Sequence, residues 1–196
     1  DDFDNPQIIK SKEERDMYIP KPDEDSIPED INLKVGERVS YSQISTYEYC
    51  PKKYKYGYVY KIPTKPHAAL SFGISVHNTL RDFYMLLQKS KEGLGITEAP
   101  NEENLLELFD KRWVKGGYES KKHEEKRKKS GIKVMKDFYT KFYSEDQNPY
   151  RMEQSFTINL PESSFVGKID RIDLVEMKEE VPVVEIIDYK TGKLKS

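Results

Sequence analysis

The sequence has one cysteine and no long hydrophobic run, and both shortages exclude whole classes of protein. Cys50 stands alone among 196 residues, which excludes an internal disulfide framework and suits a reducing compartment. No apolar stretch approaches the roughly 20 residues that a membrane-spanning helix needs, and charged residues make up 35% of the chain. We therefore expect a cytoplasmic protein without a membrane segment.

The sequence also lacks an initiating methionine, an internal repeat and a glycine-rich phosphate loop. Its first residue is Asp1, and Gly192 follows Lys190, whereas a phosphate-binding loop needs its glycines before the lysine. The last strand pattern ends only a few residues before Ser196. We expect a piece of a larger protein, truncated within its domain at the C-terminus.

Acidic and basic residues are unevenly distributed around a net charge of −2. Residues 1–40 hold twelve acids and six bases, with several prolines and few apolar residues. This predicts a linker or arm that joins a preceding domain, or equally a tail that only solubilises the chain. Residues 111–136 hold eleven bases and three acids, which suits either a solvated helix face or a surface that contacts phosphates.

Helical periodicity dominates the middle of the chain, over residues 70–89, 104–114 and 120–144. In the first of these helices we expect Ser71 to be the N-cap. Its inward stripe consists of His77, Leu80, Tyr84 and Leu87. A lone inward histidine is more often a hydrogen-bonded core residue than a ligand, so His77 gains interest only if other ligands lie nearby.

The segment 41–63 contains seven of the fourteen tyrosines, interleaved with lysines. We expect a helix capped by Ser42 and interrupted by Pro51. Aromatic rings among lysines can stack on bases and neutralise phosphates. Alternatively, the tyrosines anchor a helix in the core while the lysines form its solvated face, and the residues alone favour this second interpretation.

Two alternating runs, 166–175 and 183–189, predict a β-hairpin, and residues 151–160 predict a strand before it. If the turn is centred on Glu179, two residues lie opposite each other when their numbers add up to 358. The opposite pairs are then Asp170 and Asp188, Ile172 and Ile186, and Leu174 and Val184. The last two pairs form an apolar face that we expect to be buried.

The two facing carboxylates repel each other unless a cation lies between them. Divalent cations such as magnesium take carboxylate oxygens, and Lys190 lies on the same face as Asp188. Alternatively, the hairpin is a surface ribbon in which Asp188 pairs with Lys190 and Asp170 pairs with Lys168. We favour the metal site, because a metal beside a lysine suits phosphodiester hydrolysis.

GKID at 167–170, followed by EIIDYKTGK at 185–193, resembles the core of the PD-(D/E)XK nuclease superfamily, in particular its RecB-like branch. Upstream, YSQISTYEYCPKKYKY and LSFGISVHNTLRDFY resemble the opening helix and the histidine-bearing helix of such domains. The combination is similar to nuclease domains at the C-terminus of UvrD/PcrA-like DNA helicases. The resemblance covers residues 41–196.

This resemblance implies an α/β, restriction-endonuclease-like core, a mixed sheet with an antiparallel meander flanked by helices. It implies that magnesium or manganese binds to His77, Asp170, Asp188 and the backbone carbonyl of Tyr189. The implied catalytic residues are Asp170, Asp188 and Lys190, with Lys190 positioning or activating the attacking water. The implied function is DNA hydrolysis in repair or recombination, in one polypeptide with a helicase module. The alternative is an inactive nuclease-fold module that binds DNA or docks a helicase.

Three further positions bear on the resemblance. Glu153 falls near the implied site, although strand alternation puts its side chain on the side opposite Phe156. Ile169 stands where the name of the superfamily has proline, as is common in RecB-like members. Cys50 occupies the place of a cysteine that binds an iron–sulfur cluster in some branches, but its C-terminal partners are absent from this sequence, so a cluster is neither supported nor excluded.

Overall fold

A computed structural model describes residues 38–94 and 98–192, so nearly all of the expected arm over residues 1–40 lies outside it. The helices are α2 (Tyr41–Tyr49), α3 (Pro51–Tyr54), the π-helix η2 (Lys55–Val59), α4 (Ala68–Lys91), α5 (Glu102–Arg112) and α6 (Lys121–Phe142). The strands are β1 (Arg38–Ser40), β2 (Pro149–Asn159), β3 (Ser164–Lys178) and β4 (Val181–Ile187). The expected α/β class, a mixed sheet with flanking helices, is confirmed.

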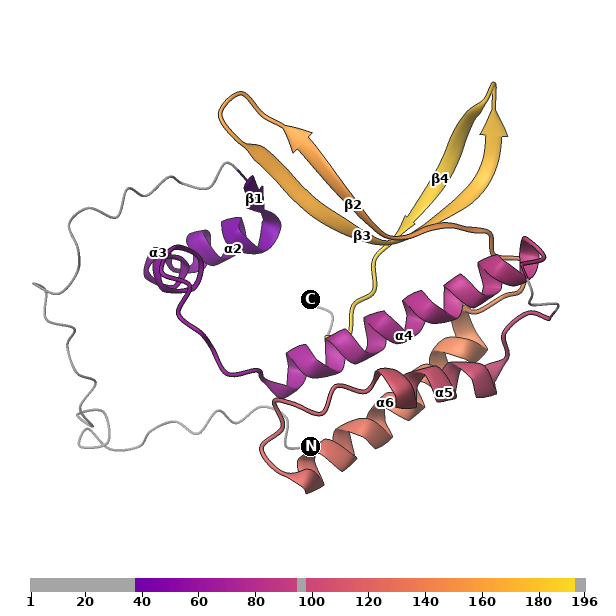
Figure 1. The fold of residues 1–196 in the computed structure, drawn as a ribbon, viewed down its shortest axis with the longest axis horizontal. Coiled ribbons are helices and arrows are strands. Elements are labelled where there is room, and N and C mark those ends of the chain that lie inside the picture. Colours follow the sequence, from indigo (N-terminus) through magenta and orange to yellow (C-terminus); the bar gives the residue numbers. More distant parts are fainter. Residues whose placement is uncertain (1–37, 95–97, 193–196) are drawn as a thin grey trace, which may run out of the picture. The chain divides into compact units, whose positions relative to one another are not determined.

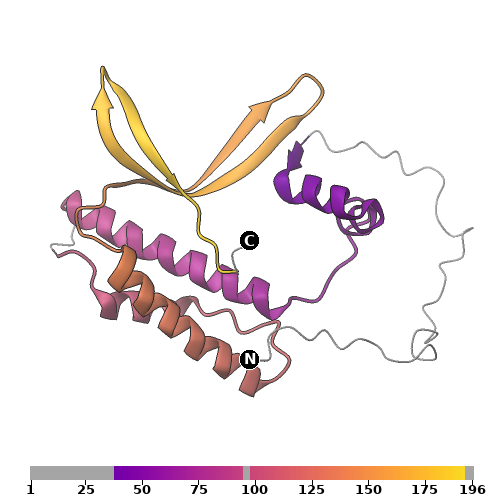
Figure 2. The ribbon, with the colours of Figure 1, turned by 180° about the vertical axis from the view of Figure 1, so that it is seen from behind.

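Strand β3 is the centre of the sheet. β2 pairs with one edge of β3 in the antiparallel direction. The other edge of β3 pairs with β1 in the parallel direction near its start and with β4 in the antiparallel direction further along. The β2–β3 and β3–β4 hairpins diverge from a common point beside α4 (Figures 1 and 2). The predicted antiparallel meander is therefore present. The parallel β1 was not predicted, because three residues are too short to show a period.

The hydrophobic core lies mainly among α4, α5 and α6. Its buried apolar side chains are Phe72, Val76, Leu80, Phe83, Tyr84, Leu87, Leu105, Phe109, Trp113 and Met135. Helix α6 packs tightly against α5 at Gly131, where an added Cβ would lie 2.3 Å from the Phe109 ring. The predicted cap of α4 is wrong: His67 Nδ1 accepts the first-turn N–H of Leu70, while Ser71 is buried inside the helix.

The tyrosine-rich segment is helical but does not enter the core. Ser40, not the predicted Ser42, caps α2 through a capping box with Gln43. The predicted interruption is present, since α2 ends at Cys50 and α3 begins at Pro51. No residue of α2, α3 or η2 is buried. The favoured interpretation of the tyrosines as core anchors is therefore wrong.

The β3–β4 register agrees with the prediction where Ile172 pairs with Ile186 and Leu174 with Val184. The turn itself is a two-residue turn with positive φ at positions 179 and 180, and a register shift after Leu174 accommodates it. The predicted burial of this apolar face is wrong, since Ile186 is 63% exposed. The alternate positions of β3 face α4 instead, and they carry the buried side chains of residues 171 and 173.

Candidate metal centre

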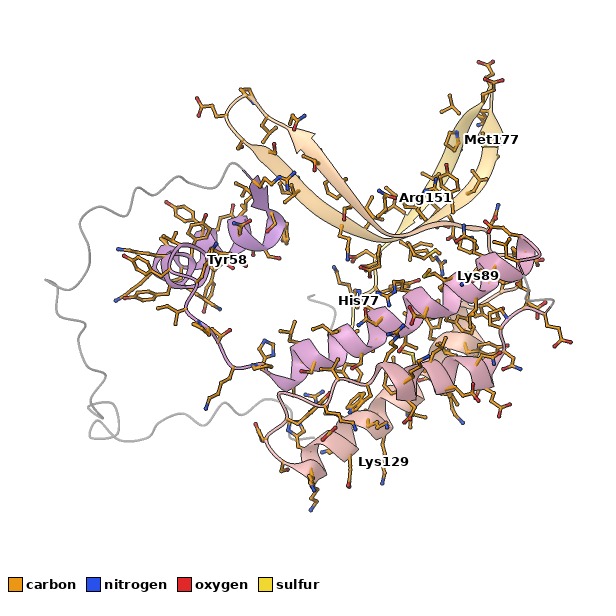
Figure 3. All side chains as sticks on the ribbon, viewed as in Figure 1. Tyr58, His77, Lys89, Lys129, Arg151 and Met177 are labelled. Atoms are coloured by element: carbon orange, nitrogen blue, oxygen red, sulfur yellow. The ribbon has the colours of Figure 1, made fainter. Side chains whose placement is uncertain are left out.

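Three side chains from three elements converge next to the point where the hairpins diverge. They are His77 of α4, Glu153 of β2 and Asp170 of β3, and their ligand atoms lie within 4.8 Å of one another. His77 Nδ1 lies 3.2 Å from Asp170 Oδ1, so the histidine faces the strands and is half-buried rather than in the core (Figure 3). The three line a cleft of about 480 Å³. One imidazole nitrogen and carboxylate oxygens are ligands that manganese and magnesium accept.

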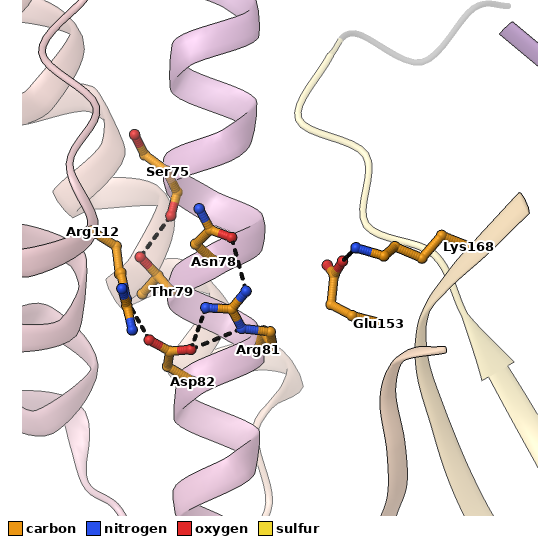
Figure 4. Close-up of polar contacts among 8 residues, drawn as sticks. All are labelled: Ser75, Asn78, Thr79, Arg81, Asp82, Arg112, Glu153 and Lys168. Carbon is orange, nitrogen blue, oxygen red and sulfur yellow. Dashed lines mark hydrogen bonds and ion pairs between the residues drawn. The ribbon is translucent and has the colours of Figure 1, made fainter. Parts of the chain in front are cut away.

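Glu153 joins this group because of the β2–β3 register. Met152 pairs with Arg171 and Gln154 with Ile169, which places Glu153 opposite Asp170. Glu153 has φ 51, a left-handed conformation that costs a glutamate on the order of 1–3 kcal/mol. Its carboxylate also forms an ion pair of 2.6 Å with Lys168 (Figure 4).

The alternation argument against Glu153 failed because it assumed uniform strand geometry through β2. A usable signal was present in the sequence. With a turn at residues 161–162, opposite positions of β2 and β3 sum to 323, as in the observed pairing. The same arithmetic that set Asp170 opposite Asp188 thus also sets Asp170 opposite Glu153.

Asp170 is held from two sides. Its Oδ1 contacts His77, and its Oδ2 accepts the backbone N–H of Tyr189 at 2.7 Å. The Tyr189 ring packs edge-on against the His77 ring, with centroids 5.9 Å apart. Burial raises the pKa of the Tyr189 hydroxyl well above its usual range, so this group stays a neutral phenol at physiological pH. The N–H of Tyr189 thus ties the chain that follows β4 directly to the Asp170 carboxylate.

Asp188 and Lys190 flank Tyr189 and are more exposed. Their side chains form an ion pair of 2.6 Å, as the surface-ribbon alternative expected, and 57% and 74% of their side-chain surfaces remain exposed. The β4 ladder ends with Arg171 opposite Ile187, one step before Asp170 and Asp188. Among the described residues, Asp188 is not part of the three-residue ligand group.

Lys190 has its pKa raised, first by the hydrogen bond to Asp188 and further by the charges of Asp188 and Asp170. A raised pKa keeps the ammonium protonated throughout the neutral range. Lys190 can therefore donate a hydrogen bond or neutralise an anion.

A buried ion pair lies directly behind the site. The Arg171 guanidinium stacks 3.8 Å from the centre of the Tyr84 ring, donates to Asp173 at 3.0 Å and reaches the Tyr189 hydroxyl at 3.3 Å. Burial raises the pKa of Asp173, and the Arg171 charge opposes that rise. Sequence reasoning missed this pair because it assigned the buried face of β3 to Ile172 and its neighbours.

The basic N-terminal half of α6 lies outside the metal group. Two lysines of α6 form ion pairs with acids of α5: Lys128, in this half, with Asp110, and Lys136, in the C-terminal half, with Glu102. His123 lies against the Tyr118 ring and near Glu119, away from the three ligand residues.

Comparison with known families gives one match that spans all of these elements. A family model described as PD-(D/E)XK nuclease superfamily matches residues 38–196. Comparison with curated proteins gives no match. Among the residues that the structure describes, no helix is both long enough and apolar enough to cross a membrane.

Proposed function

Because the chain belongs to the PD-(D/E)XK nuclease superfamily, we propose that it is a metal-dependent nuclease domain that hydrolyses phosphodiester bonds in DNA. The observation that carries the proposal is the convergence of His77, Glu153 and Asp170 in one cleft. A histidine and two carboxylates this close are costly unless a cation compensates the negative charge. Magnesium or manganese fits this donor set.

The proposed ligands are His77, Asp170, Asp188 and the Tyr189 carbonyl, with Glu153 as a further carboxylate from β2. The bound ion supplies Lewis acidity toward the scissile phosphate and lowers the pKa of a water molecule. Asp170 keeps its orientation because the N–H of Tyr189 holds one oxygen and His77 contacts the other. Asp188 directly follows β4, whose pairing with β3 ends one step before Asp170, and in this proposal it supplies a further carboxylate from that strand.

Lys190 acts as a cation in this proposal. Its raised pKa keeps it protonated, so it donates a hydrogen bond that positions the attacking water or neutralises a phosphate oxygen. Its present partner is Asp188. A bound metal ion would attract the Asp188 carboxylate and a bound phosphate would attract the Lys190 ammonium, so both would compete with this ion pair.

The finer parts of the proposal concern partners. The basic half of α6 would contact DNA phosphates, and the domain would act in the cytoplasm beside a UvrD/PcrA-like helicase module in repair or recombination. The helicase context is supported by the motif resemblance alone. A second candidate is an inactive module that binds DNA or docks a helicase, and the placement of Asp188 outside the three-residue ligand group favours it.

Cleavage of linear DNA, with and without manganese, tests the proposal. We expect metal-dependent cleavage that Asp170→Asn, Asp188→Ala and Lys190→Ala each reduce by about 100-fold or more, since each removes a charge at the reacting phosphate. Glu162→Ala, which removes an exposed acid in the β2–β3 turn, is the matched control and should leave the rate unchanged. Equal degradation by all variants indicates a contaminant, and metal-independent binding without cleavage favours the inactive module.

A further inference from the structure

The segment from α2 to η2 exposes an unusual amount of aromatic surface. Its tyrosine–lysine surface consists of Tyr41, Tyr47, Tyr49, Tyr56, Tyr58, Lys52, Lys53 and Lys55, all exposed. Tyr49 alone keeps 82% of its surface in contact with solvent. In Figure 3 the side chains around Tyr58 extend outward from the helical turns. Contiguous exposed aromatic groups of this kind mark binding surfaces.

The lysines of this surface lie against its rings. Lys53 Nζ is 5.8 Å from the centre of the Tyr49 ring, and Lys52 Nζ is 5.9 Å from that of Tyr56. Each contact leaves an ammonium beside a ring that is exposed. This combination binds a nucleic-acid strand, because bases stack on the rings while the ammonium groups neutralise phosphates.

The charge of the segment identifies the chemistry of the occupant. Residues 41–66 contain five lysines and a single acid, Glu48, in a chain with a net charge of −2. The exposed apolar groups are mainly tyrosine rings rather than aliphatic side chains. A polyanion with unpaired flat bases complements both features, whereas a duplex offers its phosphates but keeps its base faces stacked.

One end of the surface, at Tyr41, lies next to residues that flank the candidate metal centre. Tyr41 and Ser42, at the start of α2, line a cleft of about 780 Å³ together with Lys168 and Asp188. A strand lying on α2 therefore reaches the residues that flank the metal group.

We propose that the tyrosine–lysine surface binds single-stranded DNA by stacking of its bases and leads the strand into the metal centre. The role of the surface in guiding a substrate rests on the proposed nuclease function. The binding itself does not, because it needs neither a metal ion nor the residues that ligate one.

The test measures binding by fluorescence anisotropy with the 196-residue chain in EDTA, so that cleavage contributes nothing. The probes are a labelled single strand of about 16 nucleotides, its duplex, and an abasic strand with the same number of phosphates. We expect the single strand to bind at least about 5-fold more tightly than the other two. Tyr49→Ala should remove roughly 5-fold of that affinity or more, and Tyr49→Phe should restore it, because the ring is retained.

Tyr150→Ala provides the matched control. Tyr150 is an exposed tyrosine on β2 that carries its own cationic neighbour, Arg151, 4.3 Å from the ring centre, but lies outside the segment. Its loss should not change the affinity. The proposal would be overturned if the abasic strand bound as tightly as the single strand, or if Tyr49→Ala left the affinity unchanged. It would also be overturned if no nucleic acid bound at all, a result that would indicate that a protein covers the surface.

Failure of the surface and failure of the nuclease are distinguishable. If binding depends on the bases but no manganese-dependent cleavage occurs, the role of the tyrosine–lysine surface is supported and the nuclease function is refuted. If Asp170→Asn abolishes cleavage but Tyr49→Ala leaves single-strand binding unchanged, the nuclease function is supported and the role of the tyrosine–lysine surface is refuted.

Discussion

Replacing Asp170 by asparagine tests metal binding without any assumption about catalysis. Asp170 is the carboxylate on which the sequence motif and the candidate ligand group agree. Asparagine keeps an oxygen that can accept the N–H of Tyr189, so the local fold should persist. It removes one negative charge and one strong oxygen ligand, so the affinity for a divalent cation should fall.

The magnitude follows from linkage. A cation that binds only the folded chain stabilises it by about 2.7 kcal/mol at a concentration 100 times its dissociation constant. For a chain of this length, 1 kcal/mol shifts the unfolding temperature by about 2–4 °C. Manganese should therefore raise the unfolding temperature of the unmodified chain by roughly 5–11 °C, and Asp170→Asn should lose more than half of that rise.

Thermal denaturation over a manganese titration, with an EDTA baseline, measures both quantities. Asp110→Asn is the matched control, because its carboxylate is exposed on α5 and pairs only with Lys128. The Asp110→Asn variant should show the same manganese-induced rise in unfolding temperature as the unmodified chain. Glu153→Gln and Asp188→Asn, run in parallel, show which carboxylates complete the ligand set. An equal shift in the unmodified chain and in Asp170→Asn would refute the metal centre.

Two further predictions concern stability and are measured by urea denaturation. Gly131→Ala should destabilise the chain by about 1–3 kcal/mol, because its Cβ meets the Phe109 ring, whereas Gly116→Ala, with open space around it, should not. Asp173→Ala should cost about 3–5 kcal/mol, because it leaves the Arg171 charge buried without its partner. A double variant with leucine and methionine in place of Asp173 and Arg171 should lose less unfolding free energy than the two single variants lose in sum. Losses that simply add would contradict the pairing.

Local geometry could be predicted from the sequence because it depends on residues close together in the chain. The pairing of Ile172 with Ile186 follows from alternation and the position of one turn. The helices α4, α5 and α6 follow from the spacing of their apolar residues. The family itself followed from motif order, and the match over residues 38–196 confirms it.

Properties that depend on distant elements could not be predicted. Which face of β3 is buried depends on where α4 packs, and alternation alone cannot distinguish the face of Ile172 from that of Arg171. Turn position could place Glu153 opposite Asp170, but the left-handed backbone at Glu153 could not be predicted from strand alternation. The exposure of the tyrosines depends on whether α2 contacts the helical core, and the spacing of aromatic residues carries no information about that.

The two motif acids share one arrangement that links them to the core. Asp170 is followed by Arg171 and Asp188 by Tyr189, and in each pair the second residue is the more buried. Successive side chains on an extended chain point to opposite sides, so each acid is the more exposed member of its pair while its successor anchors the backbone; only Asp170 lines the cleft of the candidate metal group. Because Arg171 reaches the Tyr189 hydroxyl at 3.3 Å, the anchors are connected. The positions of the two acids are therefore coupled through the contact between Arg171 and Tyr189, and a change at Arg171 should weaken metal binding as well as the fold.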